Sequence, residues 1–285
     1  MKLASTVADL REKISLSGLK PVGFVPTMGA LHDGHLSLVE TAVKQCPLVV
    51  VSIFVNPTQF NDKNDLKNYP RTLDEDLVML AKGLRVNDIV FTPSVEEIYP
   101  SEDKRIFSFG NLDTVMEARH RPGHFNGVAQ VVSRLFQIVD PDFAWFGQKD
   151  FQQLAVVKEL VRQTGFKVKI IGNPIIREPD GLAMSSRNRL LDTEIRKNAS
   201  VIFRSLSAVA EMLRQHEINE IKKWVDDTIN SVPGFRVEYF EIADDTELIP
   251  LSEKSDIIPG RKYFACIAVK AGNIRLIDNM EIALV

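Results

Sequence analysis

The sequence predicts an α/β protein in which a Rossmann-like, doubly wound parallel sheet domain is followed by a smaller α+β domain. Two observations predict the first domain. Short apolar runs alternate with amphipathic stretches of helical spacing, and the apolar runs are continuous, as in strands buried on both faces. After Ile176 the pattern changes to two helical stretches followed by three β-like runs, which predicts the second domain. We place the two domains at residues 1–176 and 177–285.

In the first domain, each predicted strand is an apolar run and each predicted helix is an amphipathic stretch. The strands are Val22–Val25, Leu48–Val55, Asp88–Thr92, Phe143–Phe146 and Lys167–Ile171. The helices are His35–Cys46, Thr72–Leu84, Phe125–Val139 and Phe151–Thr164. Thr72 and Asp150 mark two of the helix starts. Sheets of this kind bind ligands beyond the carboxyl ends of their strands, so we expect a site in the loops there.

The second domain opens with a turn-rich stretch, Arg177–Gly181. Its predicted helices are Asp192–Gln215 and Asn219–Val232. Its predicted strands are Arg236–Ala243, Tyr263–Lys270 and Asn273–Ile277. The sequence Ala271-Gly272-Asn273 is typical of a hairpin turn between the last two strands.

Composition excludes several classes of protein. The chain has 285 residues, of which 45% are hydrophobic and 26% charged, as in ordinary globular proteins. Its net charge of −3 argues against a nucleic acid gripped mainly through its phosphates. Cys46 and Cys266 have no metal-type spacing and suit a reducing cytosol, and the apolar run Leu48–Val55 is too short to span a bilayer. We therefore expect a cytoplasmic protein with no membrane or nucleic acid partner.

The most informative stretch is Pro26–His35, between the first predicted strand and the first predicted helix. The first N–H groups of a helix lack internal partners and carry partial positive charge, so a phosphate fits there. Gly29 and Gly34 let the backbone approach such a ligand, and His32 and His35 could donate hydrogen bonds to its oxygens. The alternative is an ordinary strand-to-helix loop with a solvated His35.

Asn56 and Gln59 follow the second predicted strand, within Phe54–Phe60. Their amides offer neutral donors and acceptors suited to the hydroxyl or carboxylate groups of a small substrate. An Asn-Pro turn explains Asn56 without a ligand, but it does not explain Gln59. The two interpretations stay open on the residues alone.

Two further stretches carry cationic side chains. Lys149 stands where a strand ends and a helix begins, so its ammonium could meet a phosphate. Beside it, Asp150 is interpreted as a helix cap, and Gln153 could face the same site. Near the domain boundary, Met184–Asn188 places two serines beside Arg187, a set that could clamp a phosphate chain. A polar hinge loop is the alternative for this last stretch.

Two weaker signals lie between these stretches. Asp74, Glu75 and Asp76 stand at a predicted helix start and could hold Mg²⁺, although capping explains at least two of them. The basic loop Arg119–His124 is either a mobile cover or anion contact, or a solvated loop, which we favour. The sequence has no Ser-His-Asp or Cys-His arrangement, Walker-type loop or GxGxxG pattern. This favours chemistry by positioning and charge stabilisation.

The His-x-Gly-His element of Pro26–His35, with the Ser-rich basic loop, resembles the HxGH nucleotidyltransferase superfamily, whose members join a substrate to the α-phosphate of a nucleotide. Within it, six stretches occur in the order typical of the pantothenate synthetase (pantoate–β-alanine ligase) family. They are Pro26–His35, Phe54–Phe60, Tyr69–Thr72, Arg121–Phe125, Gly147–Gln153 and Asp180–Asn188. Six matches in order make the resemblance far more specific than HxGH alone.

The resemblance implies ATP-dependent condensation of (R)-pantoate with β-alanine through a pantoyl adenylate, with release of pyrophosphate and AMP. It implies ATP and Mg²⁺ as cofactors, pantoate and β-alanine as small-molecule partners, a homodimer, and a lid role for residues 177–285. It implies four catalytic residues, with His35 as proton donor: His32, His35, Lys149 and Arg187.

The resemblance also implies the binding residues. Those for ATP are Met28, Gly29, Ala30, Leu31, His32, Asp33, Gly34, His35, Gly147, Gln148, Lys149, Asp150, Ile176, Met184, Ser185, Ser186 and Arg187. Those for pantoate and β-alanine are Asn56, Gln59 and Gln153, and the residue for the Mg²⁺ environment is Asp76. The sequence departs from the family pattern at Gln148, where many members have glutamate.

Two other functions stay open on the sequence. Another HxGH enzyme would transfer a nucleotide to a phosphorylated acceptor, but a phosphate would need more cations than Asn56, Gln59 and Gln153 provide. A nucleotide-binding regulatory module without catalysis would leave both glutamines without a ligand.

Overall fold

The computed structural model describes residues 1–283, and the chain separates into two compact units. The first unit comprises Met1–Phe109, Arg121–Gln148 and Val156–Pro174. The second comprises Gly110–His120, Lys149–Ala155 and the chain from Ile175 onward. Helix α8 (Phe151–Thr164) begins in the second unit and ends in the first. None of the helices in the described part of the chain has the length and apolar character needed to cross a membrane.

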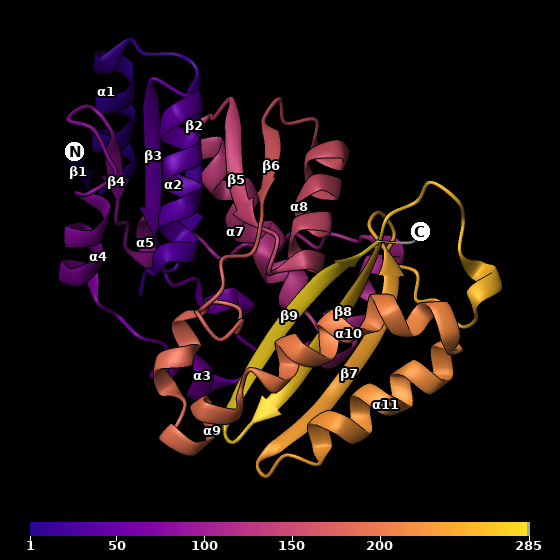
Figure 1. Ribbon diagram of the computed structural model, residues 1–285. Helices are drawn as coiled ribbons and strands as arrows, with labels where there is room; N and C mark the ends of the chain where they lie inside the picture. The colour runs from indigo at the N-terminus through magenta and orange to yellow at the C-terminus, as the bar shows by residue number, and fades with distance from the viewer. Residues whose placement is uncertain (284–285) are drawn as a thin grey trace. The chain divides into compact units, whose positions relative to one another are not determined.

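Six parallel strands form the sheet of the first unit, in the order β1-β4-β3-β2-β5-β6 (Figure 1). They are β1 (Lys2–Ala4), β2 (Val22–Thr27), β3 (Leu48–Ile53), β4 (Ile89–Phe91), β5 (Phe143–Gly147) and β6 (Lys169–Asn173). From β2 the chain proceeds outward through β3 and β4, and β5 then pairs with the other side of β2. The order therefore reverses between β2 and β5, which is where sheets of this kind bind ligands.

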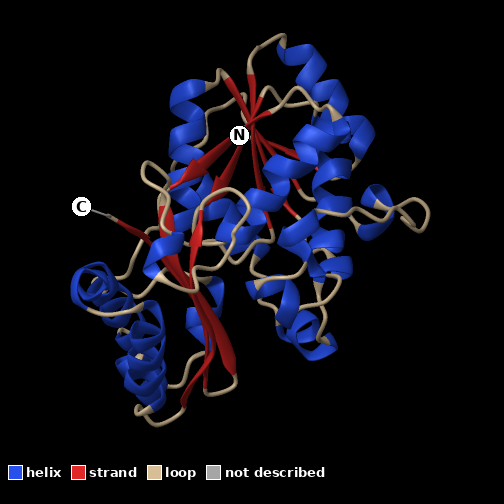
Figure 2. Cartoon of the chain, turned by 90° about the vertical axis from the view of Figure 1, so that its right-hand side faces the viewer, coloured by secondary structure: helices blue, strands red, loops and turns tan. Residues whose placement is uncertain are grey.

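Helices cover both faces of this sheet because its central strands are apolar on both sides (Figure 2). Val25, Val51 and Trp145 pack into the cluster that includes α2 (Asp33–Gln45) and α4 (Leu73–Leu80). The neighbouring residues Phe24 and Phe146 point the other way. Both pack edge-to-face on Phe136 of α7 (His124–Val139), with ring centroids 6.3 and 6.5 Å apart. Neighbouring residues of a strand thus pack against helices on opposite faces of the sheet. This confirms the doubly wound fold that the continuous apolar runs predict.

The predicted strands and helices of the first unit are confirmed to within a few residues, and the unpredicted elements are short. The sequence missed the three-residue β1 and the helix α1 (Val7–Ser17), which Thr6 caps. The predicted helix Thr72–Leu84 ends at Leu80, where the chain turns toward β4. Two other short helices of this unit are α3 (Lys63–Asn68) and α5 (Val95–Ile98), whereas α6 (Met116–His120) lies in the second unit.

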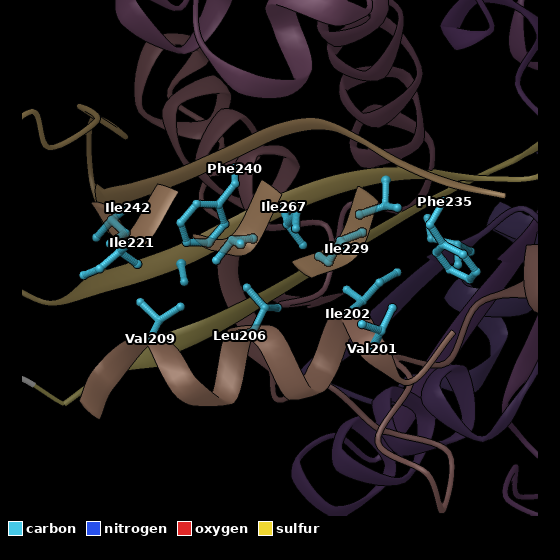
Figure 3. Packing of buried hydrophobic residues seen from close by; sticks show 14 of the residues in the cluster. Val201, Ile202, Leu206, Val209, Ile221, Ile229, Phe235, Phe240, Ile242 and Ile267 are labelled. Carbon is cyan, nitrogen blue, oxygen red and sulfur yellow. The ribbon is translucent and has the colours of Figure 1, made fainter. Parts of the chain in front are cut away.

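The second unit contains an antiparallel sheet in the order β7-β8-β9, covered on one face by two helices (Figure 3). The strands are β7 (Phe235–Asp244), β8 (Tyr263–Ala271) and β9 (Ile274–Ile282), and the helices are α10 (Val201–Gln215) and α11 (Ile218–Asn230). Leu206 and Val209 of α10 meet Ile221 and Ile229 of α11 over Ile267 of β8, all buried. The predicted helix Asp192–Gln215 is wrong in one respect: it breaks at Ala199 and Ser200 into α9 (Thr193–Asn198) and α10.

Candidate active site

The stretch between β2 and α2 forms a tight loop that Asp76 of α4 holds in place. Gly29 and Ala30 both have left-handed backbone, with φ of 78° and 49°. The N–H groups of Ala30 and Leu31 donate to the two oxygens of the Asp76 carboxylate at 2.9 and 2.7 Å. A Cβ at Gly29 would lie 2.9 Å from Asp76 Oδ2, so glycine is needed for both conformation and space.

His32 and His35 cap α2 with their own rings. Nδ1 of His32 accepts from the N–H of Gly34 at 3.2 Å, and Nδ1 of His35 accepts from the N–H of His32 at 3.3 Å. A neutral imidazole whose Nδ1 accepts a hydrogen bond carries its proton on Nε2. The two rings, with centroids 4.1 Å apart, therefore carry Nε2–H donors at the positive end of a 13-residue helix. Asp33 and Gly34 form the first turn of this helix.

Gln59 ends the short 3₁₀ helix η1 (Pro57–Gln59), and its side chain reaches the loop after β2. Its Nε2 donates to Met28 Sδ at 3.1 Å, and its Oε1 accepts from Asn56 Nδ2 at 3.1 Å. His124 Nδ1 lies 2.8 Å from the Gln59 carbonyl oxygen. The structure thus brings the predicted ATP residue Met28 next to the predicted substrate residue Gln59.

Helix α7 lies close against η1 because residue 127 is glycine. A Cβ at Gly127 would lie 2.3 Å from the carbonyl oxygen of Thr58. His124, which we expected in a solvated loop, is buried at the first turn of α7, so that expectation is wrong for this residue. No sequence pattern connects Tyr99 with Asn56 either, yet the Tyr99 hydroxyl donates to Asn56 Oδ1 at 2.9 Å. Tyr99 lies 43 residues from Asn56 along the chain, and Gly127 lies 71. Local spacing does not reveal such pairs.

The chain after β5 divides between the units. In the first unit Gly147 ends β5, and the N–H of Gln148 donates to Asn173 O at 2.8 Å. In the second unit the carbonyl of Lys149 accepts from Asn279 Nδ2 at 3.0 Å. The Lys149 ammonium is 3.8 Å from Asp150 Oδ2. The predicted ATP residue Lys149 is therefore held just before α8 by a residue of β9.

Gln152 and Gln153 follow in the first turn of α8, and only Gln152 is buried. Its amide accepts from the N–H of Glu117 at 2.9 Å and donates to the carbonyls of Leu112 and Val115. The Gln152 amide therefore forms its hydrogen bonds inside the protein. Gln153, the residue that the sequence predicts for pantoate, is half-buried.

The second group of predicted ATP residues lies on a hydrogen-bonded hairpin of the second unit. Arg177 and Ala183 form an antiparallel bridge, and the N–H of Met184 donates to Ile176 O at 3.0 Å. The structure thus places Ile176 next to Met184. Ser185 caps the following 3₁₀ helix η3 (Ser186–Leu190), since its hydroxyl accepts from the N–H of Arg187 at 3.3 Å. These contacts define a hydrogen-bonded turn.

Arg177 anchors this hairpin to β9. Its guanidinium donates to both oxygens of Asp278 at 2.7 and 3.0 Å and to the carbonyls of Gly181 and Asn279. Burial raises the pKa of Asp278, while the hydrogen bond and charge of Arg177 and the charge of Lys149 oppose that shift. Two adjacent residues of β9 therefore hold both Lys149 and the hairpin that carries Met184–Arg187.

Acidic residues are poorly arranged for a protein-held metal ion. Asp74 and Glu75 are exposed, whereas Asp76 is 1% exposed and its oxygens accept from two backbone N–H groups. Among the described residues, no group of three or more His, Cys, Asp or Glu side chains could hold a metal. The contacts of Asp76 favour a role in fixing the loop.

Comparisons with known proteins agree over the whole chain. The profile of the family described as Pantoate-beta-alanine ligase matches residues 2–281. The pantothenate synthetase of Phocaeicola vulgatus is 52% identical over 286 residues, covering 99% of each chain. The crystal structure of pantothenate synthetase from Thermus thermophilus has a TM-score of 0.88 at 44% identity, covering 98% of this chain and 99% of that one. A pantoate-beta-alanine ligase structure from Francisella tularensis, complexed with beta-gamma ATP and beta-alanine, has a TM-score of 0.78 at 35% identity, covering 98% and 97%. This chain therefore belongs to the pantoate-beta-alanine ligase family, the pantothenate synthetases.

Proposed function

We propose that this chain, which synthesises pantothenate as a pantoate-beta-alanine ligase, does so in two steps. A pantoate carboxylate oxygen attacks the α-phosphorus of ATP, and the bond to pyrophosphate breaks as pantoyl adenylate forms. The β-alanine amine then attacks the acyl carbon, the C–N bond forms as the amine loses a proton, and AMP leaves. The Francisella relative, solved with beta-gamma ATP and beta-alanine, supports both co-substrates.

The observation that carries this proposal is the histidine pair at the start of α2. Each ring has its Nδ1 engaged by a backbone N–H and therefore carries an Nε2–H donor. Two fixed donors and a helix N-terminus suit the oxygens of a triphosphate, whose charge increases during adenylation. In this proposal Met28–His35 cradles ATP, and His35 donates to the charge that develops at the phosphate.

The remaining assignments are those that the family resemblance implies. Lys149 and Arg187 supply cations for the phosphates, with Met184, Ser185 and Ser186 beside Arg187. Gly147, Gln148, Asp150 and Ile176 line the adenosine. Gln59 and Gln153 hold pantoate, with Asn56 behind Gln59 and Gln59 also near β-alanine. Residues 177–285 act as the lid domain.

Mg²⁺ enters this proposal as the counterion of ATP, where it neutralises phosphate charge. Because the oxygens of Asp76 accept from Ala30 and Leu31, this carboxylate is poorly suited to bind the ion directly. The phosphates and water are better ligands for an ion that keeps several waters.

One experiment tests the two steps separately. The purified protein is given ATP, Mg²⁺ and pantoate, and release of pyrophosphate and AMP is followed before and after β-alanine is added. We expect pyrophosphate with pantoate alone and AMP only after β-alanine. Pyrophosphate without any β-alanine-dependent AMP would indicate a nucleotidyltransferase that stops at adenylation. ATP binding without either product would indicate the non-catalytic module.

We also propose that the protein is a cytoplasmic homodimer. Asn126 and Gln130 of α7 hydrogen-bond one edge of the extended segment Asp103–Phe107, where Asn126 Oδ1 accepts from Phe107 N and Gln130 Nε2 donates to the carbonyls of Asp103 and Arg105. Ile106 in this segment is 89% exposed. An extended segment with an exposed apolar residue is suited to pair with a second copy. Both cysteines are free and buried, as suits the cytosol.

Light scattering on the eluting protein tests the dimer. We expect the mass of two chains for the natural protein and a shift toward one chain for Ile106→Glu. A single-chain mass for the natural protein would contradict the proposal.

A further inference from the structure

The proposed pantoate residue Gln59 can meet its substrate with either end of its amide. The Nε2 group donates hydrogen bonds and the Oε1 atom accepts them, so the orientation decides which substrate atoms it binds. The side chain is only 9% exposed, and its surroundings fix that orientation.

The first part of these surroundings is the buried amide of Asn56. Its Oδ1 accepts from the Tyr99 hydroxyl at 2.9 Å and from the Thr58 hydroxyl at 3.1 Å. Its Nδ2 donates to Gly127 O at 3.2 Å and to Gln59 Oε1 at 3.1 Å. A reversed Asn56 amide would set its NH₂ group against the N–H of Thr58, which lies 3.4 Å from Oδ1, and its oxygen against the Gly127 carbonyl. At 1% exposure, no water could compensate for those losses.

The second part is the Tyr99 side chain itself. Burial raises its pKa, with a hydrogen bond to Thr58 opposing the shift, so the hydroxyl keeps its proton and remains a donor near neutral pH. The Tyr99 ring also packs on Phe54, with centroids 6.4 Å apart. The hydroxyl is therefore held beside Asn56 Oδ1, to which it donates.

We infer that Tyr99 and Asn56 are positioning residues, which turn the Gln59 amide so that its Nε2 donor faces the substrate. The same orientation places Nε2 at 3.1 Å from Met28 Sδ, on the side of the loop after β2. This inference rests on the proposed role of Gln59 in binding pantoate.

The orientation sets a chemical preference. An N–H donor binds the carboxylate or hydroxyl oxygens of pantoate, or the carboxylate of β-alanine. It repels the β-alanine ammonium, which also carries only donors. Gln59 therefore selects the oxygen-bearing ends of both substrates.

The decisive comparison is Gln59→Glu against Gln59→Ala. Glutamate keeps an oxygen for Asn56 Nδ2 to contact, but it loses the only donor. We expect both variants to raise the KM for pantoate at least about 10-fold while the KM for ATP stays within about twofold. If Gln59→Glu keeps the natural KM for pantoate while Gln59→Ala loses it, the oxygen faces the substrate and the inference is wrong. If Gln59→Ala itself leaves pantoate binding unchanged, the proposed role of Gln59 is wrong.

Two variants test the positioning residues. Tyr99→Phe removes one hydroxyl and should raise the KM for pantoate about 3- to 10-fold with little change in the KM for ATP. In Asn56→Asp, the aspartate cannot donate to Gln59 Oε1 and attracts Gln59 Nε2 instead. The KM for pantoate should therefore increase more, about 10- to 100-fold. The matched control is Tyr263→Phe, which removes a hydroxyl bonded to Ile258 N in the second unit and should leave both KM values unchanged.

Suppose that Gln59→Ala raises the KM for pantoate but Tyr99→Phe keeps the natural value. This result would overturn the inference while leaving the proposed function intact. Equal increases in both KM values would also overturn it, because they would show a general structural effect.

Discussion

At the scale of single residues, His32 and His35 each use the two nitrogens of the ring for two different roles. Nδ1 caps the backbone of α2, and this bond fixes the tautomer that leaves a proton on Nε2. The sequence predicted the histidines as donors to phosphate. The structure adds why both rings can donate while neutral.

His35→Asn separates the capping role from the donor role. The asparagine oxygen can take the place of Nδ1 in the cap, while no Nε2–H donor remains. We expect His35→Asn to keep the thermal midpoint of unfolding and to lower pantoate-dependent exchange of pyrophosphate into ATP by about 10²–10³-fold, as for loss of one fixed donor. His35→Ala should lose the cap as well, about 0.5–2 kcal/mol. The exposed His216 gives the control, since His216→Asn should change neither measurement. Natural exchange rates in His35→Asn would contradict the proposed role.

The residues that sequence analysis found and those it missed differ in one physical respect. Pro26–His35 is a continuous stretch whose chemistry and turn geometry are local, so its pattern was visible. Asp76 lies 46 residues from Ala30, and Asn279 lies 130 residues from Lys149. Hydrogen bonds over such separations depend on how strands and helices pack, and one sequence does not encode them in any local spacing.

At the scale of elements, α4 supports the loop after β2 through one carboxylate. Asp76→Asn replaces one oxygen with an NH₂ group that faces a backbone N–H, so one bond is lost and two donors oppose each other. We expect a loss of about 1–3 kcal/mol in unfolding free energy and a lower rate of adenylation.

The same variant distinguishes this role from metal binding. With a loop role, the Mg²⁺ concentration for half-maximal activity should be unchanged in Asp76→Asn. A several-fold increase in that concentration would instead support the sequence-based expectation that Asp76 belongs to the Mg²⁺ environment.

Strand β9 also positions predicted nucleotide residues, because Asp278 pairs with Arg177 and Asn279 hydrogen-bonds Lys149. Asp278→Ala leaves the Arg177 charge without its partner, which typically costs about 3–5 kcal/mol. We expect the variant to be destabilised by this amount in urea and to bind ATP more weakly by calorimetry. Glu241→Gln breaks the Lys222–Glu241 ion pair of the same unit and serves as the control. Unchanged ATP affinity in a folded Asp278→Ala would show that β9 does not position the nucleotide residues.

At the scale of the whole molecule, the fold was easier to predict than the site. The fold class follows from continuous apolar runs that alternate with helical stretches, and these patterns extend over many residues. The break between α9 and α10 was missed because the apolar spacing continues through Ala199 and Ser200. What the sequence could not show is which carboxylates pair with arginines and so stabilise the folded structure.

Such charges predict how stability responds to acid. Hydrogen bonds from Arg105, and more weakly from Arg134, hold the pKa of Asp103 in the first unit well below its ordinary value of 3.8, against the opposing effect of burial. A hydrogen bond from Arg196 lowers the pKa of Asp180 in the second unit. When the folded pKa is lowered, folding favours the carboxylate, and the stabilisation is fully present above the unfolded pKa. It is lost as the pH falls below about 4 toward the folded pKa.

We therefore expect the unfolding free energy, measured in urea, to fall steadily as the pH is lowered from about 5 to about 2. Asp103→Asn should be less stable than the natural protein at neutral pH, because an amide accepts the Arg105 and Arg134 hydrogen bonds less well than a carboxylate does. Its stability should fall less steeply in acid, so the two curves should converge below about pH 3. A constant difference between the two proteins over this range would mean that Asp103 does not titrate with unfolding, and that other carboxylates determine the acid sensitivity.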